Sequence, residues 1–162
     1  MLARGRSGVA GEAELSTHRR FGDGYVPPLP TSTSLGTGNG SGELPGRHLL
    51  IGMHDAGALD DVRGIEAAFL SAINAAGATL LHMHFHVFTP GGGVTGTASL
   101  AESHMSIHTW PEAGFAALDI FMCGLCDPRR SMQSILNLHR PRIIDIRYVV
   151  RGAGAGVLAL EA

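Results

Sequence analysis

The sequence predicts an α/β (α+β) fold, a two-layer sandwich in which two helices cover one face of a mainly antiparallel sheet. Two segments repeat apolar residues at three- and four-residue spacing, and short alternating or apolar stretches lie around them. The expected order is β-α-β-β-β-α-β with one further short extended piece, and such helices bury their apolar sides against one sheet face. The 162 residues, 44% of them hydrophobic, suffice for one domain core.

Strands are predicted where apolar and polar residues alternate, or where a short apolar run is bounded by turn residues. In chain order they are residues 48–53, 78–88, 94–100, 115–123 and 143–150. The short extended piece is residues 105–109, which Trp110 and Pro111 end. Pro90 and the three glycines after it predict the turn of a hairpin between the second and third strands.

The two helices are predicted from their apolar spacing and from the residues at their ends. They run from residue 60 or 61 to about 76 and from 127 to about 139. Asp60 or Asp61 can cap the first helix, and Gly77 is a natural stop for it. Asp127 and Pro128 are a favourable N-cap and first-turn pair for the second helix.

The two ends of the chain differ in composition from this middle part. Residues 1–45 are rich in Pro, Gly, Ser and Thr, and they contain too few apolar side chains to offset the entropy lost on ordering. We therefore expect a disordered leader at 1–45, one domain at 46–152 and a loose tail at 153–162.

Composition and charge argue against several classes of protein. The net charge is −2 without a broad basic field, so nucleic acid and anionic membranes are not expected partners. Apolar runs fall far short of the roughly 20 residues that cross a bilayer, and no signal-type stretch begins the sequence, which predicts a cytoplasmic protein. Cys123 and Cys126 are too few and too close together for a disulfide framework.

The densest collection of reactive side chains lies between Leu100 and Glu112. This segment holds two Ser, two His, two Glu and the only Trp of the chain. Serine and histidine side chains often only cap turns, so a polar turn with satisfied hydrogen bonds is the alternative to a catalytic site.

Two further groups could carry chemistry. His82, His84 and His86 would share one face of a strand and could bind a metal, but no nearby Asp, Glu or Cys completes a known spacing. A polar sheet face or a pocket wall is the alternative, and we expect no metal. Cys123 and Cys126 form a Cys-x-x-Cys motif that could be redox-active or bind zinc, although no second Cys pair is present. One working cysteine beside a bystander is the simpler interpretation.

Six short motifs occur in an order that carries a family resemblance. They are Gly-Arg-His-Leu-Leu at 46–50, Gly-Ala-Thr at 77–79, Phe-His-x-Phe at 85–88, Gly-Val-Thr-Gly at 93–96, Ala-Glu-Ser-His-Met-Ser-Ile-His-Thr-Trp-Pro-Glu at 101–112 and Asp-Ile-Phe-x-Cys-Gly at 119–124. Together they resemble the short prokaryotic form of the S-adenosylmethionine decarboxylase proenzyme. The block at 101–112 is the most diagnostic, and it favours a catalytic site over a polar turn.

This resemblance implies a proenzyme that cleaves itself between Glu102 and Ser103. The Ser103 hydroxyl would attack the Glu102 carbonyl, and elimination followed by hydrolysis would leave a pyruvoyl group at the new N-terminus. Serine suits this role because its β-hydroxyl is both nucleophile and leaving group. By the same resemblance His108 is the processing base. Thr95 stands where the family usually has Ser, and it keeps the hydroxyl that steadies the oxyoxazolidine intermediate.

The resemblance also implies the activity and its partners. The pyruvoyl group made from Ser103 would be the cofactor and would form a Schiff base with S-adenosylmethionine, with no metal and no pyridoxal phosphate. Cys123 would be the proton donor, Phe88 and His108 would flank the adenine, and Glu112 would accept the ribose hydroxyls. The product would supply aminopropyl groups for spermidine biosynthesis. The enzyme would be a homodimer of processed chain pairs with sites shared between protomers.

Three alternatives stay open at the level of sequence. Proteins with this fold and the same self-cleaving serine can act on ornithine or arginine, although Phe88 and Glu112 favour S-adenosylmethionine. A non-processing homologue would stay full length and serve as a regulatory binding partner. A metal- or redox-binding protein would use the three histidines at 82–86 or the two cysteines.

Overall fold

The computed structural model of the protein describes residues 15–20 and 46–151. The strands are β1 (Leu15–Arg20), β2 (Gly46–His54), β3 (Leu80–Val87), β4 (Val94–Leu100), β5 (Ser103–Trp110), β6 (Phe115–Met122) and β7 (Ile143–Arg151). The helices are α1 (Val62–Ala76) and α2 (Met132–His139), with 3₁₀ turns at Pro111–Ala113 and Pro128–Ser131. None of the helices in these two ranges is long and apolar enough to cross a membrane.

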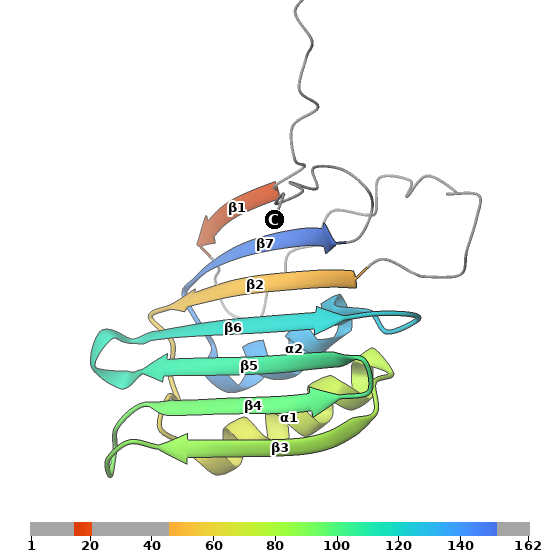
Figure 1. The fold of residues 1–162 in the computed structure, drawn as a ribbon. Coiled ribbons are helices and arrows are strands. Elements are labelled where there is room, and N and C mark those ends of the chain that lie inside the picture. Colours follow the sequence, from red (N-terminus) through yellow and green to blue (C-terminus); the bar gives the residue numbers. More distant parts are fainter. Residues whose placement is uncertain (1–14, 21–45, 152–162) are drawn as a thin grey trace, which may run out of the picture.

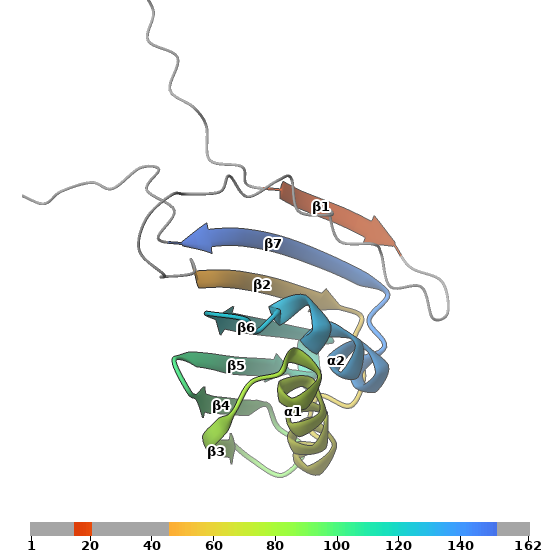
Figure 2. The ribbon, with the colours of Figure 1, turned by 90° about the vertical axis from the view of Figure 1, so that its right-hand side faces the viewer.

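The strands form one antiparallel sheet in the order β1-β7-β2-β6-β5-β4-β3. Both helices lie on the same face of this sheet (Figures 1 and 2). The last strand, β7, pairs with β2, so the two ends of the domain meet beside one another. The predicted two-layer α+β sandwich is confirmed.

The helix boundaries follow from their end residues. Asp61 accepts a hydrogen bond from the Gly64 N–H at 3.0 Å, and Gly77 ends α1 in the left-handed conformation at φ 76°. The second helix begins as a 3₁₀ turn over Pro128–Ser131 rather than as the α-helix that we predicted. Proline has no N–H to donate, and the Asp127 carboxylate instead accepts from the Arg129 N–H at 3.0 Å, which holds the first turn tight.

The core lies between the helices and the sheet. Alternate side chains of β2, β5 and β6 point into it, and they meet the apolar stripe of α1. The fully buried large side chains are Leu49, Met53, Ile65, Phe69, Met105, Ile107, Leu118, Ile120, Met122, Met132, Ile135 and His139.

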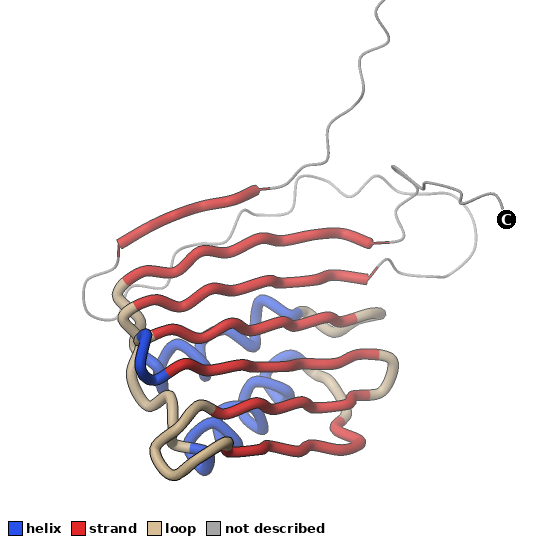
Figure 3. The backbone as a smooth tube through the Cα atoms, turned by 60° about the vertical axis from the view of Figure 1, so that its left-hand side comes forward, coloured by secondary structure: helices blue, strands red, loops and turns tan. Residues whose placement is uncertain are grey.

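The opposite side of the sheet, which we term the open face, is not covered by any element in the described residues (Figure 3). Residues paired directly across antiparallel strands share a face, which defines the members of this surface. They include His48, Leu50, His82, His84, His86, Thr95, Thr97, Ser99, His104, Ser106, His108, Asp119 and Phe121. The open face is therefore rich in imidazole and hydroxyl groups, unlike the apolar helix side.

Two segments differ from the prediction. The short piece predicted at 105–109 is a full strand, β5, because Met105, Ile107 and Thr109 are buried while polar side chains between them lie on the open face. Leu15–Arg20, inside the predicted leader, forms β1 and pairs with β7. This strand lies at the edge of the sheet, where β7 offers its main-chain groups for pairing. The rest of the leader and the tail at 153–162 lie outside the described residues.

Candidate active site

A tight hairpin connects β4 to β5 and places the predicted cleavage point at one end of the sheet. Leu100 and Ser103 pair directly, so only two residues turn the chain. One of them, Glu102, has φ of 60°, in the left-handed region that costs a residue with a side chain about 1–2 kcal/mol. The carbonyl side of the Glu102–Ser103 bond is therefore held in a strained conformation.

Cys123 contacts both sides of this bond. It follows the end of β6, next to the beginning of β5. The Cys123 Sγ–H donates to the Glu102 carbonyl oxygen at 3.0 Å, and the Cys123 backbone N–H donates to Ser103 Oγ at 3.2 Å. The predicted nucleophile, the carbonyl it would attack and the predicted proton donor thus form one cluster.

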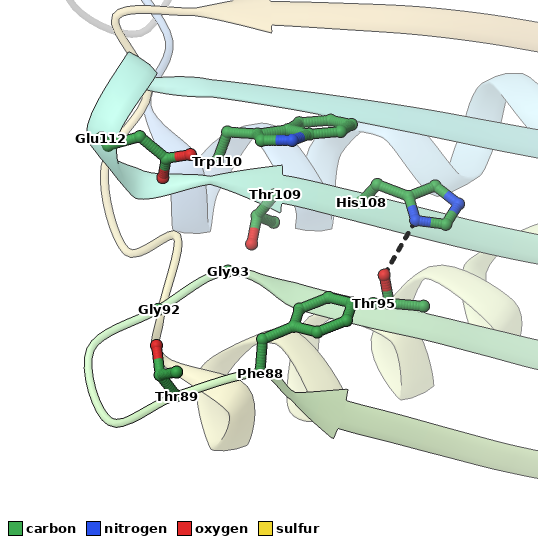
Figure 4. Close-up of a pocket in the computed structure, with 9 residues that line it drawn as sticks. All are labelled: Phe88, Thr89, Gly92, Gly93, Thr95, His108, Thr109, Trp110 and Glu112. Atoms are coloured by element: carbon green, nitrogen blue, oxygen red, sulfur yellow. Dashed lines mark hydrogen bonds between the residues drawn. The ribbon is translucent and has the colours of Figure 1, made fainter.

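Thr95 and His108 form a second cluster on the open face. They pair directly across β4 and β5, and a hydrogen bond joins Thr95 Oγ1 to His108 Nδ1 at 2.9 Å (Figure 4). A hydrogen bond at one ring nitrogen fixes the orientation of the imidazole and leaves the other nitrogen, Nε2, to act on a reactant.

A cleft of about 530 Å³ opens beside this pair. Its lining residues are Phe88, Thr89, Gly92, Gly93, Thr95, His108, Thr109, Trp110 and Glu112. Figure 4 shows Phe88 and Trp110 on two sides of the opening, with Glu112 toward the end opposite His108. The volume and the mixture of aromatic rings with a few polar groups are typical of a small-molecule site.

The aromatic walls of the cleft are exposed. Phe88 is 64% and Trp110 is 41% exposed. The Trp110 ring stacks on Phe115, with 5.5 Å between ring centroids, so its orientation is fixed. Two aromatic surfaces thus face solvent where a flat ligand ring could bind.

Buried hydrogen bonds behind the cleft hold its floor. Thr109 Oγ1 donates to the Leu59 carbonyl oxygen at 2.6 Å and accepts from the Val94 N–H at 2.7 Å. A Cβ on Gly93 would overlap the Thr109 carbonyl oxygen, so this turn position must be glycine. Sequence reasoning missed Trp110, Thr109 and Gly93 as parts of the site, although the exposed Trp within the diagnostic block was a usable signal.

The two clusters are far apart within one chain. Ser103 and His108 lie five residues apart on β5, which places their Cα atoms about 17 Å from each other at ~3.3 Å per residue. The odd spacing also directs their side chains to opposite faces. The structure therefore brings Glu102, Ser103 and Cys123 together at one end of β5, and Thr95, His108, Phe88 and Glu112 at the other.

The other sequence candidates stay outside both clusters. His82, His84 and His86 are exposed on β3, and no group of His, Cys, Asp and Glu within 15–20 and 46–151 could hold a metal ion. Cys126 is a free thiol whose Sγ–H donates to the Gly77 carbonyl oxygen at 3.4 Å. The metal-binding alternative thus has no support in the described part of the chain.

The fold and site define a class of small-molecule enzyme: an α+β sandwich with a strained Glu-Ser hairpin bond and an aromatic cleft. The family model for S-adenosylmethionine decarboxylase matches residues 47–152, and the chain belongs to this family.

Individual relatives agree with this assignment. The S-adenosylmethionine decarboxylase proenzyme of Methanococcus aeolicus is 45% identical over 111 residues, which are 67% of this chain and 94% of the relative. The proenzyme of Thermomicrobium roseum is 37% identical over 108 residues, 66% of this chain and 93% of the relative. The crystal structure of the adenosylmethionine decarboxylase from Aquifex aeolicus has a TM-score of 0.60 and 33% identity, covering 75% of this chain and 98% of its own.

Proposed function

We propose that this chain cleaves itself between Glu102 and Ser103 and then decarboxylates S-adenosylmethionine with the pyruvoyl group made from Ser103. The products are CO2 and decarboxylated S-adenosylmethionine, a donor of aminopropyl groups for spermidine biosynthesis. The observation that carries the proposal is the position of Cys123, which hydrogen-bonds to Glu102 O and to Ser103 Oγ at once. The relatives named above are called proenzymes, which agrees with a chain that matures by cleavage.

The residues around the hairpin favour the first step, attack of Ser103 Oγ on the Glu102 carbonyl carbon. The oxygen of that carbonyl gains negative charge, and the Cys123 thiol already donates a hydrogen bond to it. The strained φ of Glu102 raises the energy of the uncut chain relative to the product. The ester that results loses the Ser103 α-proton to a base, and β-elimination releases the Glu102 carboxylate.

His108 is the base in this proposal, and it acts on a second copy of the chain. The ~17 Å between Ser103 and His108 on one β5 is too long for proton transfer. A twofold axis through the open face near Ser106, the middle of β5, would bring the Ser103 end of one copy opposite the His108 end of the other. An isologous dimer of this kind contains two identical, shared sites.

The cleft supports S-adenosylmethionine over ornithine or arginine as the substrate. Phe88 and Trp110 offer faces for the adenine ring, and a ring beside the sulfonium adds ~0.5–2 kcal/mol of cation–π attraction. The Glu112 carboxylate at the rim can accept hydrogen bonds from the ribose hydroxyls. Ornithine and arginine have neither a nucleobase nor a ribose, so these groups would stay unused.

The pyruvoyl carbonyl supplies the electron sink that carboxyl loss requires. Cys123 stays beside the residue that carries this carbonyl, and its thiol can return a proton to the substrate α-carbon. A free thiol in this role requires a reducing compartment, so a cytoplasmic location forms part of the proposal.

The test is CO2 release from labelled S-adenosylmethionine, ornithine and arginine by one preparation of the wild-type chain. We expect turnover of S-adenosylmethionine alone, and no turnover by the Ser103→Ala variant, which should also stay uncut. Turnover of only a basic amino acid would contradict the proposed binding of adenine by Phe88 and of ribose by Glu112. Normal cleavage of the Ser103→Ala chain would contradict the assignment of Ser103 as the nucleophile.

A further inference from the structure

Cys126 is the one thiol that the proposed function leaves without a role. It lies at the far end of the turn that begins at Cys123, and the Cys126 N–H donates to the Cys123 carbonyl oxygen at 3.3 Å. Residues at the two ends of such a turn have Cα atoms less than about 7 Å apart. Disulfides require a Cα separation of about 4.4–6.8 Å, so the backbone brings the two cysteines within or close to bridging range.

The two thiols have different partners in this structure. Cys123 Sγ donates to the Glu102 carbonyl oxygen at 3.0 Å, whereas Cys126 Sγ donates to the Gly77 carbonyl oxygen at 3.4 Å. Both cysteines are free and partly exposed. Because thiol hydrogen bonds are weak, only a small cost opposes the rotation of each side chain toward the other.

The turn between the cysteines can change conformation without disturbing the core. Leu125 is 94% exposed, and nothing lies within 4 Å of a Cβ placed on Gly124, which has φ of 63°. The Cys126 side of the turn is anchored, because Arg47 Nη1 donates to the Cys126 carbonyl oxygen at 3.1 Å. Formation of a bridge would therefore draw the Cys123 thiol away from Glu102, toward Cys126.

We propose that Cys123 and Cys126 are a peroxide-responsive pair whose reversible disulfide switches the enzyme off. This inference rests on the proposed function, since Cys123 is the residue beside the reacting bond. The Cys123 thiolate attacks one peroxide oxygen, which gives a sulfenic acid and releases water or an alcohol. The Cys126 thiolate attacks the sulfenic sulfur and displaces water. Both thiols lose their hydrogens, the peroxide is reduced, and an external dithiol reverses the bridge.

The bridge has two consequences for the site. It removes the thiol hydrogen bond to the Glu102 carbonyl, and it removes the proton donor for decarboxylation. It also protects Cys123, because a sulfenic acid that lacks a resolving thiol is oxidised further to irreversible acids. Cys126 thus determines whether oxidation of Cys123 can be reversed.

The test compares the processed wild-type enzyme with Cys126→Ser and Cys126→Ala after treatment with hydrogen peroxide. Serine keeps a hydroxyl for the Gly77 carbonyl and alanine keeps an apolar contact, so both variants should retain basal activity. Oxidised wild type should lose the mass of two hydrogen atoms, lose its activity and regain it with dithiothreitol. The variants should gain oxygen mass and recover less than about a tenth of their activity, because sulfinic acids resist dithiothreitol.

Recovery to the same extent in wild type and both variants would overturn the switch, as would oxidised wild type without an internal disulfide. The uncut Ser103→Ala chain separates this inference from the proposed function. Its two cysteines should form the same bridge under peroxide, measured by intact mass alone. A disulfide that forms in a chain without activity would support the redox pair even if the proposed function were wrong. An active enzyme that forms no disulfide would refute the redox pair and leave the proposed function unaffected.

Discussion

At the scale of single residues, local geometry strains the backbone at Glu102 and places the Cys123 thiol beside its carbonyl group. A two-residue turn holds Glu102 at φ 60°, and the residue that follows β6 directs a thiol at its carbonyl oxygen. The diagnostic block predicted Ser103 and His108 as site residues. The strain at Glu102 and the contact with Cys123 could not be predicted, since the first depends on the geometry of the β4–β5 turn and the second on the register of β5 against β6.

Thr95 offers a test of the processing base. Thr95→Val removes the hydroxyl that hydrogen-bonds to His108 Nδ1 and keeps the side-chain shape. A hydrogen bond of this kind is worth ~1 kcal/mol, so we expect self-cleavage to slow about fivefold. Thr95→Ser keeps the hydroxyl and should cleave at close to the wild-type rate. The measurement is the rate of appearance of the smaller fragment. Equal rates for the Thr95→Val and Thr95→Ser variants would contradict the proposal that the Thr95 hydroxyl orients His108.

At the scale of elements, the residue patterns predicted most strands and both helices. They did not predict the full length of β5 or the 3₁₀ turn at the start of the second helix. The run at 105–109 looked short because the two residues before it, Ser103 and His104, are polar, although both belong to β5. The start of the second helix is 3₁₀ because Asp127 bonds to Arg129 locally. Such local hydrogen bonds compete with the helix pattern and leave little trace in residue periodicity.

The end of α2 contains a titratable group in the core, His139. It is fully buried, and its Nδ1 hydrogen-bonds to the Gly57 carbonyl oxygen at 2.9 Å. Burial lowers the pKa of His139 below its ordinary value of 6.5, because the charged imidazolium loses its hydration. The unfolded chain therefore binds the proton more readily than the folded chain. The contribution of neutral His139 to stability is complete above pH 6.5 and is lost as the pH falls below it.

His139→Gln should weaken this acid dependence. In the uncut Ser103→Ala chain, the free energy of unfolding should fall as the pH drops below about 6.5, by at most ~1.4 kcal/mol per pH unit for each proton bound. The glutamine variant should have a lower stability at neutral pH and a shallower slope in acid. Urea unfolding at several pH values measures both, and parallel pH profiles for the two chains would contradict the role of His139.

At the scale of the whole molecule, the proposed mechanism requires a second copy of the chain because the two clusters lie far apart. Each chain has the proposed cleavage point at one end of β5 and the proposed base, His108, toward the other. The sequence motif predicted the members of the site. The distance between the two clusters follows from the positions of Ser103 and His108 on one strand. Their five-residue spacing in the sequence was the signal for this distance.

Coexpression of two defective chains tests the shared site. His108→Ala lacks the base and Ser103→Ala lacks the nucleophile, so neither should be cut alone. In a mixed dimer, the intact His108 of the Ser103→Ala chain can serve the intact Ser103 of the other. With random pairing of equal amounts, about half of the His108→Ala chains should then be cut. If the His108→Ala chain stayed uncut in the mixture, the site would lie within one chain.

The most direct measurement for the central claim is the intact mass of the purified wild-type chain under denaturing, reducing conditions. The account predicts two fragments, residues 1–102 and 103–162, and the second should begin with a group that reacts with hydrazides and has no free α-amine. A single mass for all 162 residues, without a ketone-reactive terminus, would contradict it. The chain would then have the fold of the family without an electron sink for decarboxylation.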